Sequence, residues 1–151
     1  MAVYIKHVDG DDLEDDLRRI HDAVFGDDAP LVDFKLGEWW IAYERPETKG
    51  ESPIFAGFAG YVPAFSTPGA AYFNRSGVLP SFRGQGLQRR LLRVRELHAK
   101  RHGYVRGITD TTENVPSARN LAKEKWLPFT PRYNWNKLPC AIYWKKEWPL
   151  G

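Results

Sequence analysis

The residues whose types and spacing best suit chemistry lie near the middle of the chain, at positions 78–92. There a predicted strand ends at Leu79, a turn begins at Pro80, and two glycines, Gly84 and Gly86, precede a long amphipathic helix. The first amides of a helix have no partner within it, and the helix dipole adds about half a positive charge at that end. Because glycine lets the backbone approach a ligand closely, this segment predicts a site for a pyrophosphate or a similar anion.

Charged donors could complete such a site, since Arg83 and Arg89 flank the two glycines. The segment lacks the Gly-x-Gly-x-x-Gly of a dinucleotide-binding fold and the Gly-Lys-Ser/Thr of a phosphate-binding loop. A glycine-rich turn that binds no ligand is the structural alternative.

Charge is distributed unevenly along the chain, although the net charge is only +3. Residues 1–45 hold twelve acids against five bases, whereas residues 83–106 hold eight bases against the single acid Glu96. The basic block is consistent with a polyanionic ligand, either a nucleotide phosphate or a nucleic acid, and equally with a solvated helix face.

The elements that must position these residues follow from the spacing of the apolar side chains. Alternating or aromatic-rich runs predict strands at 2–8, 38–45, 54–62, 70–79, 104–109, 127–135 and 141–148. Apolar spacings of three and four predict helices at 11–25, 30–37, 84–102 and 114 to about 125. In the long helix we expect a buried stripe, with arginines on the other faces. Its members are Leu87, Leu91, Val94, Leu97 and His98.

The glycine segment resembles the acyl-coenzyme A signature of the GNAT superfamily of N-acetyltransferases, whose core is Arg/Gln-x-x-Gly-x-Gly/Ala. Here the pattern reads Val-x-Pro-x-x-Arg-Gly-x-Gly-Leu from Val78, so that Arg83 and Gly86 match the core. Gln88 departs from it, because the family usually has glycine or alanine at that position.

A second stretch resembles the family's Asn-x-x-Ser/Ala-x-x-x-Tyr-x-x-x-Gly-Phe helix. Asn114 and Ser117 match, and Trp126 lies where an aromatic residue is expected. Leu121 replaces the tyrosine of this motif, and Lys125 replaces its glycine.

The resemblance implies an α/β (α+β) fold: a single mixed, mostly antiparallel seven-stranded sheet flanked by about four helices. It also implies a V-shaped splay between the fourth and fifth strands, at 70–79 and 104–109. We expect one acyltransferase domain over residues 1–151.

By the same resemblance the chain binds acetyl-CoA as a co-substrate, with the pyrophosphate on the amides of the glycine segment. An amide near Gly77 or Val78 would bond the thioester oxygen. The implied cofactor-binding residues are Gly77, Val78, Leu79, Arg83, Gly84, Gln85, Gly86, Leu87, Gln88, Arg89, Asn114, Ser117 and Leu121. Helix capping is the alternative role of Asn114 and Ser117.

Direct transfer needs a neutral amine, so a base or a water path must take its proton. Many family members carry a glutamate on the fourth strand, and residues 70–79 have none. Tyr72, Asn74 and Ser76 share one face of that strand and could position a water. Tyr133 is the candidate to replace the tyrosine lost at position 121, and a packed aromatic is its alternative role.

The sequence therefore predicts an N-acetyltransferase that acts on a primary amine, either a small molecule or a protein. Nucleic-acid binding or modification, and acyl-CoA binding without catalysis, are the alternatives. The single cysteine, Cys140, excludes an internal disulfide and a Cys-rich metal site. We expect no metal, no membrane span, a cytoplasmic location, and a monomer or homodimer.

Overall fold

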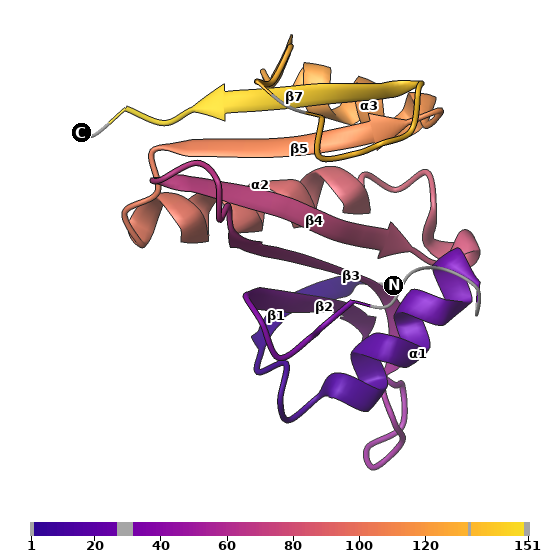
Figure 1. Cartoon of the computed structure of the whole chain (residues 1–151). Helices are drawn as coiled ribbons and strands as arrows, with labels where there is room; N and C mark the ends of the chain where they lie inside the picture. The colour runs from indigo at the N-terminus through magenta and orange to yellow at the C-terminus, as the bar shows by residue number, and fades with distance from the viewer. Residues whose placement is uncertain (1, 27–31, 133, 150–151) are drawn as a thin grey trace. The chain divides into compact units, whose positions relative to one another are not determined.

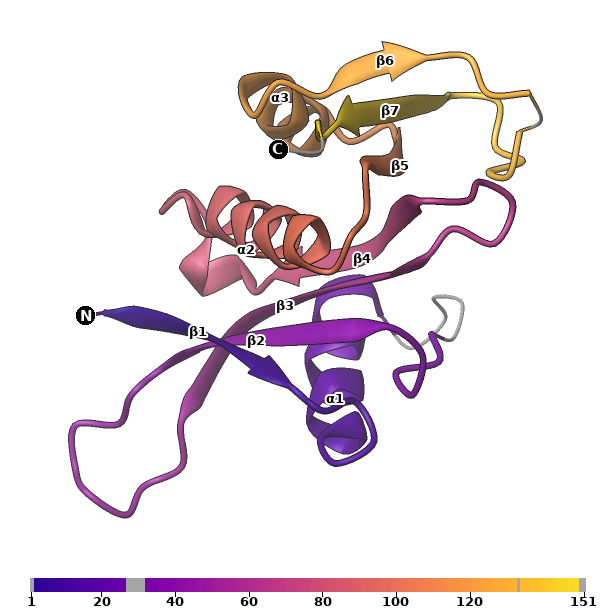
Figure 2. The same cartoon turned by 90° about the vertical axis from the view of Figure 1, so that its left-hand side faces the viewer.

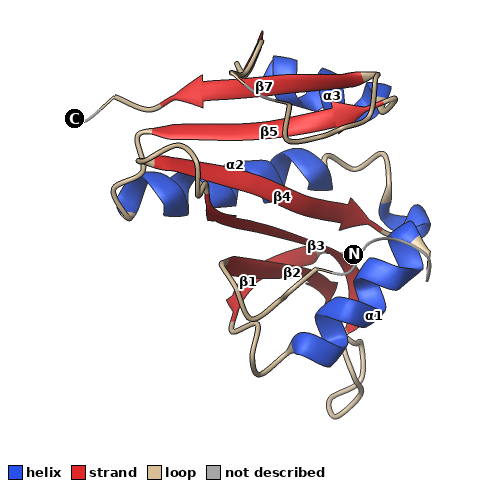
Figure 3. Cartoon of the chain, in the orientation of Figure 1, coloured by secondary structure: helices blue, strands red, loops and turns tan. Residues whose placement is uncertain are grey.

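The computed structural model describes residues 2–26, 32–132 and 134–149. These divide into two compact units, one formed by Met1–Val62 with Arg75–Arg95 and the other by Pro63–Asn74 with Glu96–Gly151. The strands are β1 (Val3–Val8), β2 (Glu38–Glu44), β3 (Ile54–Pro63), β4 (Ala70–Val78), β5 (Arg106–Thr112), β6 (Leu127–Phe129) and β7 (Ala141–Glu147) (Figure 1). The helices are α1 (Glu14–Phe25), the short 3₁₀ helix η1 (Pro80–Phe82), α2 (Leu87–Arg101) and α3 (Val115–Lys123) (Figure 3).

The strands form one mixed seven-stranded sheet in the order β1-β2-β3-β4-β5-β7-β6. The β1–β2, β2–β3, β5–β7 and β6–β7 pairs are antiparallel, whereas β4 and β5 are parallel. The parallel ladder comprises only three residue pairs and ends at Tyr72 and Ile108. Just beyond it, the Thr109 hydroxyl donates to the Phe73 carbonyl at 2.7 Å. A side-chain hydroxyl thus replaces a backbone N–H as the donor between β4 and β5 where their ladder ends. This agrees with the predicted splay between the two strands.

The core of the first unit lies between α1 and the strands β1, β2 and β3 (Figure 2). Leu17 and Ile20 of α1 pack with Trp39 and Phe58, and all four side chains are almost completely buried. Trp39 and Ile41 lie two residues apart and so point to the same face of β2. Trp40 and Ala42, on the opposite face, are buried as well, which is why this strand can carry a continuous apolar run.

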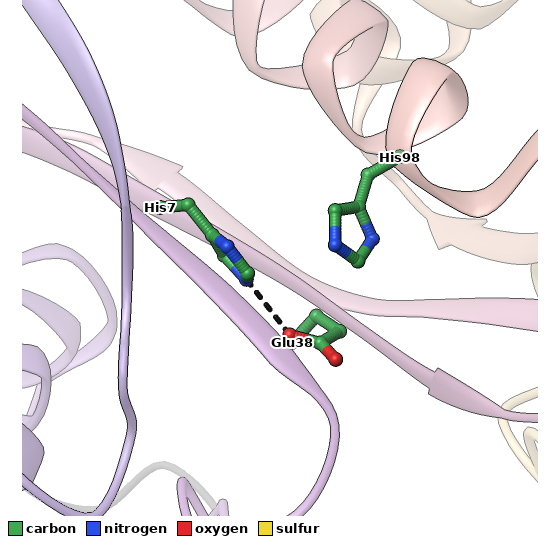
Figure 4. A group of neighbouring side chains, drawn as sticks. All are labelled: His7, Glu38 and His98. Carbon is green, nitrogen blue, oxygen red and sulfur yellow. Dashed lines mark hydrogen bonds and ion pairs between the residues drawn. The ribbon is translucent and has the colours of Figure 1, made fainter. Parts of the chain in front are cut away.

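On the edge of this unit, the neighbouring strands β1 and β2 hold a polar pair. His7 Nε2 lies 2.7 Å from Glu38 Oε2 (Figure 4). The His7 ring also stacks on Trp40, with the ring centroids 4.8 Å apart. His7 and Trp40 are partners in the strand register, so the stacking follows directly from the antiparallel pairing.

The first turns of α2 also belong to this unit, and they bury a charged residue. Arg95 is 5% exposed and donates from Nη1 to the Gly60 carbonyl at 3.1 Å and from Nε to the Leu91 carbonyl at 3.2 Å. The predicted stripe was wrong in part, because Leu97 is 48% exposed, whereas Arg95 is buried. The arginine fits because its guanidinium reaches backbone carbonyls while its methylene stem packs among apolar side chains.

The second unit is built around large aromatic rings. Phe73 of β4 packs against Trp126 and Trp148, with ring centroids 5.2 and 6.1 Å away, and both tryptophans are buried. A Cβ at Gly107 would lie 2.6 Å from the Trp126 ring, so only glycine lets β5 pass beneath it. The buried carboxylate of Glu96 is neutralised by Lys146, 2.8 Å away.

The end of α3 explains why a lysine can stand at position 125. The Trp126 N–H bonds the Leu121 carbonyl at 3.0 Å and the Lys125 N–H bonds the Ala122 carbonyl at 3.1 Å, which is a Schellman motif. This motif requires a left-handed residue, and Lys125 has φ of +72°. The lysine therefore takes the conformation that glycine adopts at lower cost.

Several predicted boundaries differ from the structure. Residues 32–37 form turns rather than a helix, and residues 30 and 31 of that prediction lie outside the described part. The described residues thus hold three α-helices and one 3₁₀ helix instead of about four helices. The long helix begins at Leu87 rather than 84, and β6 ends at Phe129 rather than 135. Within the described ranges, no helix has the length and apolar character needed to cross a bilayer.

Replacing Lys125 with glycine is expected to stabilise the protein by about 1 kcal/mol, because glycine has no Cβ to oppose the left-handed conformation. Chemical denaturation followed by circular dichroism would measure the free energy of unfolding. Arg119→Gly, at an exposed position inside α3, is the control and should destabilise by about 1 kcal/mol. Destabilisation by both changes would contradict this account of position 125.

Candidate functional site

A sharp corner joins β4 to α2 in the first unit. The strand ends at Val78, η1 follows at Pro80–Phe82, and the helix begins at Leu87. Between them Gly84 and Gly86 have φ of +78° and +76°, which L-residues rarely adopt. The sequence needs glycine at both positions for this reason alone, and such alternation can turn successive N–H groups toward one side.

The corner is open to solvent. A Cβ built at Gly84 or at Gly86 would meet no atom within 4 Å, and both residues are exposed. The first helical hydrogen bond runs from the Arg90 N–H to the Gly86 carbonyl at 3.2 Å. The preceding amides, at positions 87–89, therefore lie in the first turn, where a helix offers them no acceptor. This arrangement can bind an anion through backbone N–H groups.

The backbone of β4 offers a second set of polar groups. The Leu79 N–H bonds the Ala56 carbonyl at 2.8 Å, so Leu79 directs its backbone groups toward β3. The bonds Leu79–Ala56 and Ala64–Ala70 run in opposite sequence directions, so β3 and β4 are antiparallel. The alternation of such a ladder turns the backbone groups of Val78 away from β3. The Val78 carbonyl accepts a hydrogen bond from Arg83 Nε at 3.1 Å. Of the strand residues predicted to bind cofactor, Leu79 therefore uses its N–H within the sheet, and the Val78 carbonyl is bonded to Arg83.

Gly77 is needed because helix α1 presses on it. A Cβ at this position would lie 2.7 Å from Val24 Cγ1 and 3.2 Å from Phe58 Cε1. Its carbonyl would in turn lie 2.6 Å from a Cβ at Gly57 on β3. The predicted close backbone approach is therefore present on both sides of this glycine.

Gln88, the departure from the family signature, has a defined structural role. Its Oε1 accepts a hydrogen bond from Ser76 Oγ at 3.2 Å. The side chain therefore lies toward β4 and ties the first turn of α2 to the strand. The same bond occupies the hydroxyl of Ser76, one of the three side chains predicted to act on the amine.

In the second unit, the residues of the second motif shape helix α3. Asn114 is the N-cap, and its Oδ1 accepts from the Ser117 N–H at 3.1 Å. Leu121 is buried, with 6% exposure, and belongs to the core. Capping thus accounts for the Asn114 side chain, and Ser117, which is partly buried, contributes its backbone N–H to the cap.

A carboxylate that the sequence interpretation missed stands on β5. Asp110 Oδ2 accepts from the Tyr72 hydroxyl at 2.8 Å and from Trp135 Nε1 at 2.7 Å. Its Oδ1 accepts from Asn136 Nδ2 at 2.8 Å. The only signal was an acid inside the run Gly-Ile-Thr-Asp-Thr-Thr, which alternation alone does not separate from a surface strand residue.

The remaining predicted residues are less informative. Asn74 is partly buried on the same face of β4 as Tyr72. Gln85 is exposed in the corner and Arg89 is partly buried in the first turn of α2. Tyr133 lies outside the described residues.

The basic block of the sequence is not a single exposed face. Arg95 is buried, Arg90 donates to the Val3 carbonyl at 2.9 Å, and Arg106 pairs with Glu147 at 2.8 Å. Several of its positive charges are therefore engaged within the protein.

Fold and corner together define an acyl-CoA-type transferase architecture. The chain belongs to the acetyltransferase (GNAT) family, whose model matches residues 10–127. No curated protein sequence matches the chain.

Solved structures share the fold at low sequence identity. A Lactobacillus plantarum protein assigned as an N-acetyltransferase has a TM-score of 0.74 and 17% identity, and 97% of this chain and 99% of that chain are covered. The ribosomal-protein-S18-alanine N-acetyltransferase of Escherichia coli has a TM-score of 0.71 and 15% identity over 99% and 96%. A Bacillus subtilis acetyltransferase in complex with CoA has a TM-score of 0.71 and 13% identity over 97% and 99%.

Removing the Asn114 side chain is expected to cost about 1 kcal/mol of stability, because the first turn of α3 loses an acceptor for its orphan amide. Thermal or chemical denaturation of Asn114→Ala would measure the loss. Asn114→Asp, which keeps an oxygen at the same place, serves as the control and should retain most of the stability. Equal losses in both variants would show that the cap hydrogen bond is not the stabilising contact.

Proposed function

We propose that the protein transfers an acetyl group from acetyl-CoA to a primary amine by direct attack. The open glycine corner carries this proposal, because the space beside Gly84 and Gly86 is empty and the first amides of α2 have no acceptor within the helix. The diphosphate of acetyl-CoA would lie on the amides of residues 84–89, where the helix dipole also favours negative charge. The CoA bound in the Bacillus subtilis relative supports this choice of ligand.

The thioester would bind to the backbone groups near the end of β4 that point away from β3. The Val78 N–H, directed away from β3, is the proposed donor to the thioester oxygen. A donor aimed at the developing oxyanion typically contributes about 3 kcal/mol to catalysis. Gly77 holds this backbone in place, since contacts from Val24 and Phe58 fix it on one side.

In the proposed reaction a neutral amine attacks the carbonyl carbon, a C–N bond forms, and the C–S bond breaks to release CoA thiolate. The nitrogen loses one proton, and the thiolate gains one. Tyr72, Asn74 and Ser76 share the β4 face proposed to conduct the first proton, through water. Tyr72 donates its own proton to Asp110, so its oxygen can accept a hydrogen bond from a water of this path. Tyr133 is the proposed donor to the thiolate.

The acceptor is proposed to be a small-molecule or protein amine. The Escherichia coli relative is named for acetylating an alanine of ribosomal protein S18, so the fold is compatible with a protein acceptor. We further propose that residues 1–151 form one catalytic domain, Asn114 and Ser117 assist cofactor binding, and the enzyme acts in the cytoplasm as a monomer or homodimer.

Replacing Gly86 with alanine is expected to weaken acetyl-CoA binding about tenfold or more, because the methyl group enters the anion corner and the left-handed backbone is strained. Isothermal titration calorimetry would measure the dissociation constant.

Gly50→Ala provides a matched control for this test. Gly50 has φ of +98°, is exposed, and has no neighbour within 4 Å of a Cβ, but it lies in the β2–β3 connection. Both variants should therefore lose similar stability, and only Gly86→Ala should lose affinity. Unchanged acetyl-CoA affinity in Gly86→Ala would contradict the proposed anion site.

Turnover is tested by following CoA thiol release from acetyl-CoA with a panel of primary amines, with acetylated product detected by mass spectrometry. Amine-dependent release is the expected result. Tight acetyl-CoA binding with no product from any amine would favour a non-catalytic binding protein. Salt-sensitive binding to DNA or RNA without acetyl-CoA binding would favour the nucleic-acid alternative.

A further inference from the structure

Asp110 is held in an unusual way for a partly buried acid. All three of its hydrogen-bond donors are uncharged: a phenol, an indole and a carboxamide, from Tyr72, Trp135 and Asn136. Neutral donors orient a carboxylate and offset its desolvation, but they leave its net charge in place. Among the described residues, no lysine, arginine or histidine forms an ion pair with Asp110.

The contrast with the other buried acid of the same unit sharpens this point. Glu96 has Lys146 at 2.8 Å, so its charge is neutralised inside the protein. Asp110 therefore carries a fixed negative charge in a partly dehydrated setting, where attraction to a cation is stronger than in bulk water.

The surroundings of Asp110 are aromatic. The Trp135 ring contacts those of Tyr143, Tyr72 and Phe129, with centroids 4.5, 6.1 and 6.1 Å away. Two further hydrogen bonds hold this cluster in place. The Tyr143 hydroxyl donates to the Asn136 carbonyl at 2.6 Å, and Asn136 Nδ2 also donates to Thr112 Oγ1 at 3.1 Å.

One lysine of β7 lies over a different ring of this unit. Lys145 Nζ lies 5.5 Å from the centroid of Phe129, and the same lysine is 4.0 Å from Glu147. Asp110, Tyr72 and Trp135 are all partly exposed, so a ligand can reach this cluster. A carboxylate framed by aromatic rings suits an alkylammonium group, since the rings add cation–π attraction and exclude water.

We propose that Asp110, Tyr72 and Trp135 form a subsite for a second cationic group of the acceptor, separate from the nitrogen that is acetylated. This inference rests on the proposed acetyltransferase function. The separation follows from protonation: a nearby carboxylate favours the charged ammonium, whereas the attacking nitrogen must be neutral. The acceptor class is therefore an alkyl diamine or polyamine, or a compound that presents two such amines.

The binding test uses the full chain without acetyl-CoA, so that it does not depend on turnover. 1,4-Diaminobutane and n-pentylamine are matched in length and differ in the distal ammonium. Titration followed by NMR of the indole N–H signals, with that of Trp135 assigned from Trp135→Phe, should show a shift with the diamine and about tenfold weaker binding of the monoamine. Equal binding of the two probes, or no shift of the Trp135 signal, would overturn the proposal.

A variant that removes only the charge of Asp110 tests whether this charge binds the second ammonium group. Asp110→Asn keeps the size of the side chain and removes the charge, so it should weaken diamine binding about tenfold and leave monoamine binding nearly unchanged. Glu113→Gln, an exposed acid on the same segment, is the control and should change neither. Circular dichroism would verify that each variant folds. If Asp110→Asn does not fold, the wild-type comparison of the two probes still decides the matter.

Turnover separates this inference from the proposed function. With acetyl-CoA present, Asp110→Asn should raise KM for 1,4-diaminobutane about tenfold, with little change in kcat or in the affinity for acetyl-CoA. Equal losses with both amines would contradict a subsite for a second cation. Failure to bind acetyl-CoA would instead refute the acetyltransferase proposal, while the diamine titration would still test the subsite.

Discussion

The backbone conformation of two glycines determines how the chain turns between β4 and α2. Gly84 and Gly86 both occupy the left-handed region, and the chain there reverses from a strand into a helix within a few residues. Side chains at these positions would strain the backbone and cover its amides. The first turn of α2 then offers amides that have no acceptor within the helix, which is the arrangement that binds anions at helix N-termini.

Neighbouring contacts hold this corner rigidly. Ser76 and Gln88 link strand to helix, Val24 packs against Gly77, and Leu79 is bonded to β3. Each contact restrains a different element on which the corner depends. Gln88 shows how the fold accommodates a departure from the family signature. Its side chain lies toward β4 and links the first turn of α2 to that strand.

Local features were predictable from the sequence, and distant pairings were not. The glycine corner, the Asn114 cap and the order of the strands follow from backbone preferences and periodicity, which act over a few residues. Asp110 was missed because Tyr72 and Trp135 are 38 and 25 residues away in sequence. Arg95 was predicted to be exposed, because the spacing of apolar residues along the helix does not show where a backbone carbonyl can accept a hydrogen bond from a buried guanidinium. The Gly60 carbonyl accepts such a bond.

The hydrogen bond from Arg83 to the Val78 carbonyl has a consequence for affinity. In the proposed mode of binding, an amide of the pantetheine arm would need this carbonyl as its acceptor. The two donors compete for one oxygen, so Arg83 would have to change rotamer when acetyl-CoA binds. Exposed side chains change rotamer within nanoseconds, so this exchange would not slow association; it would instead lower the affinity by the free energy of the arginine hydrogen bond that is lost.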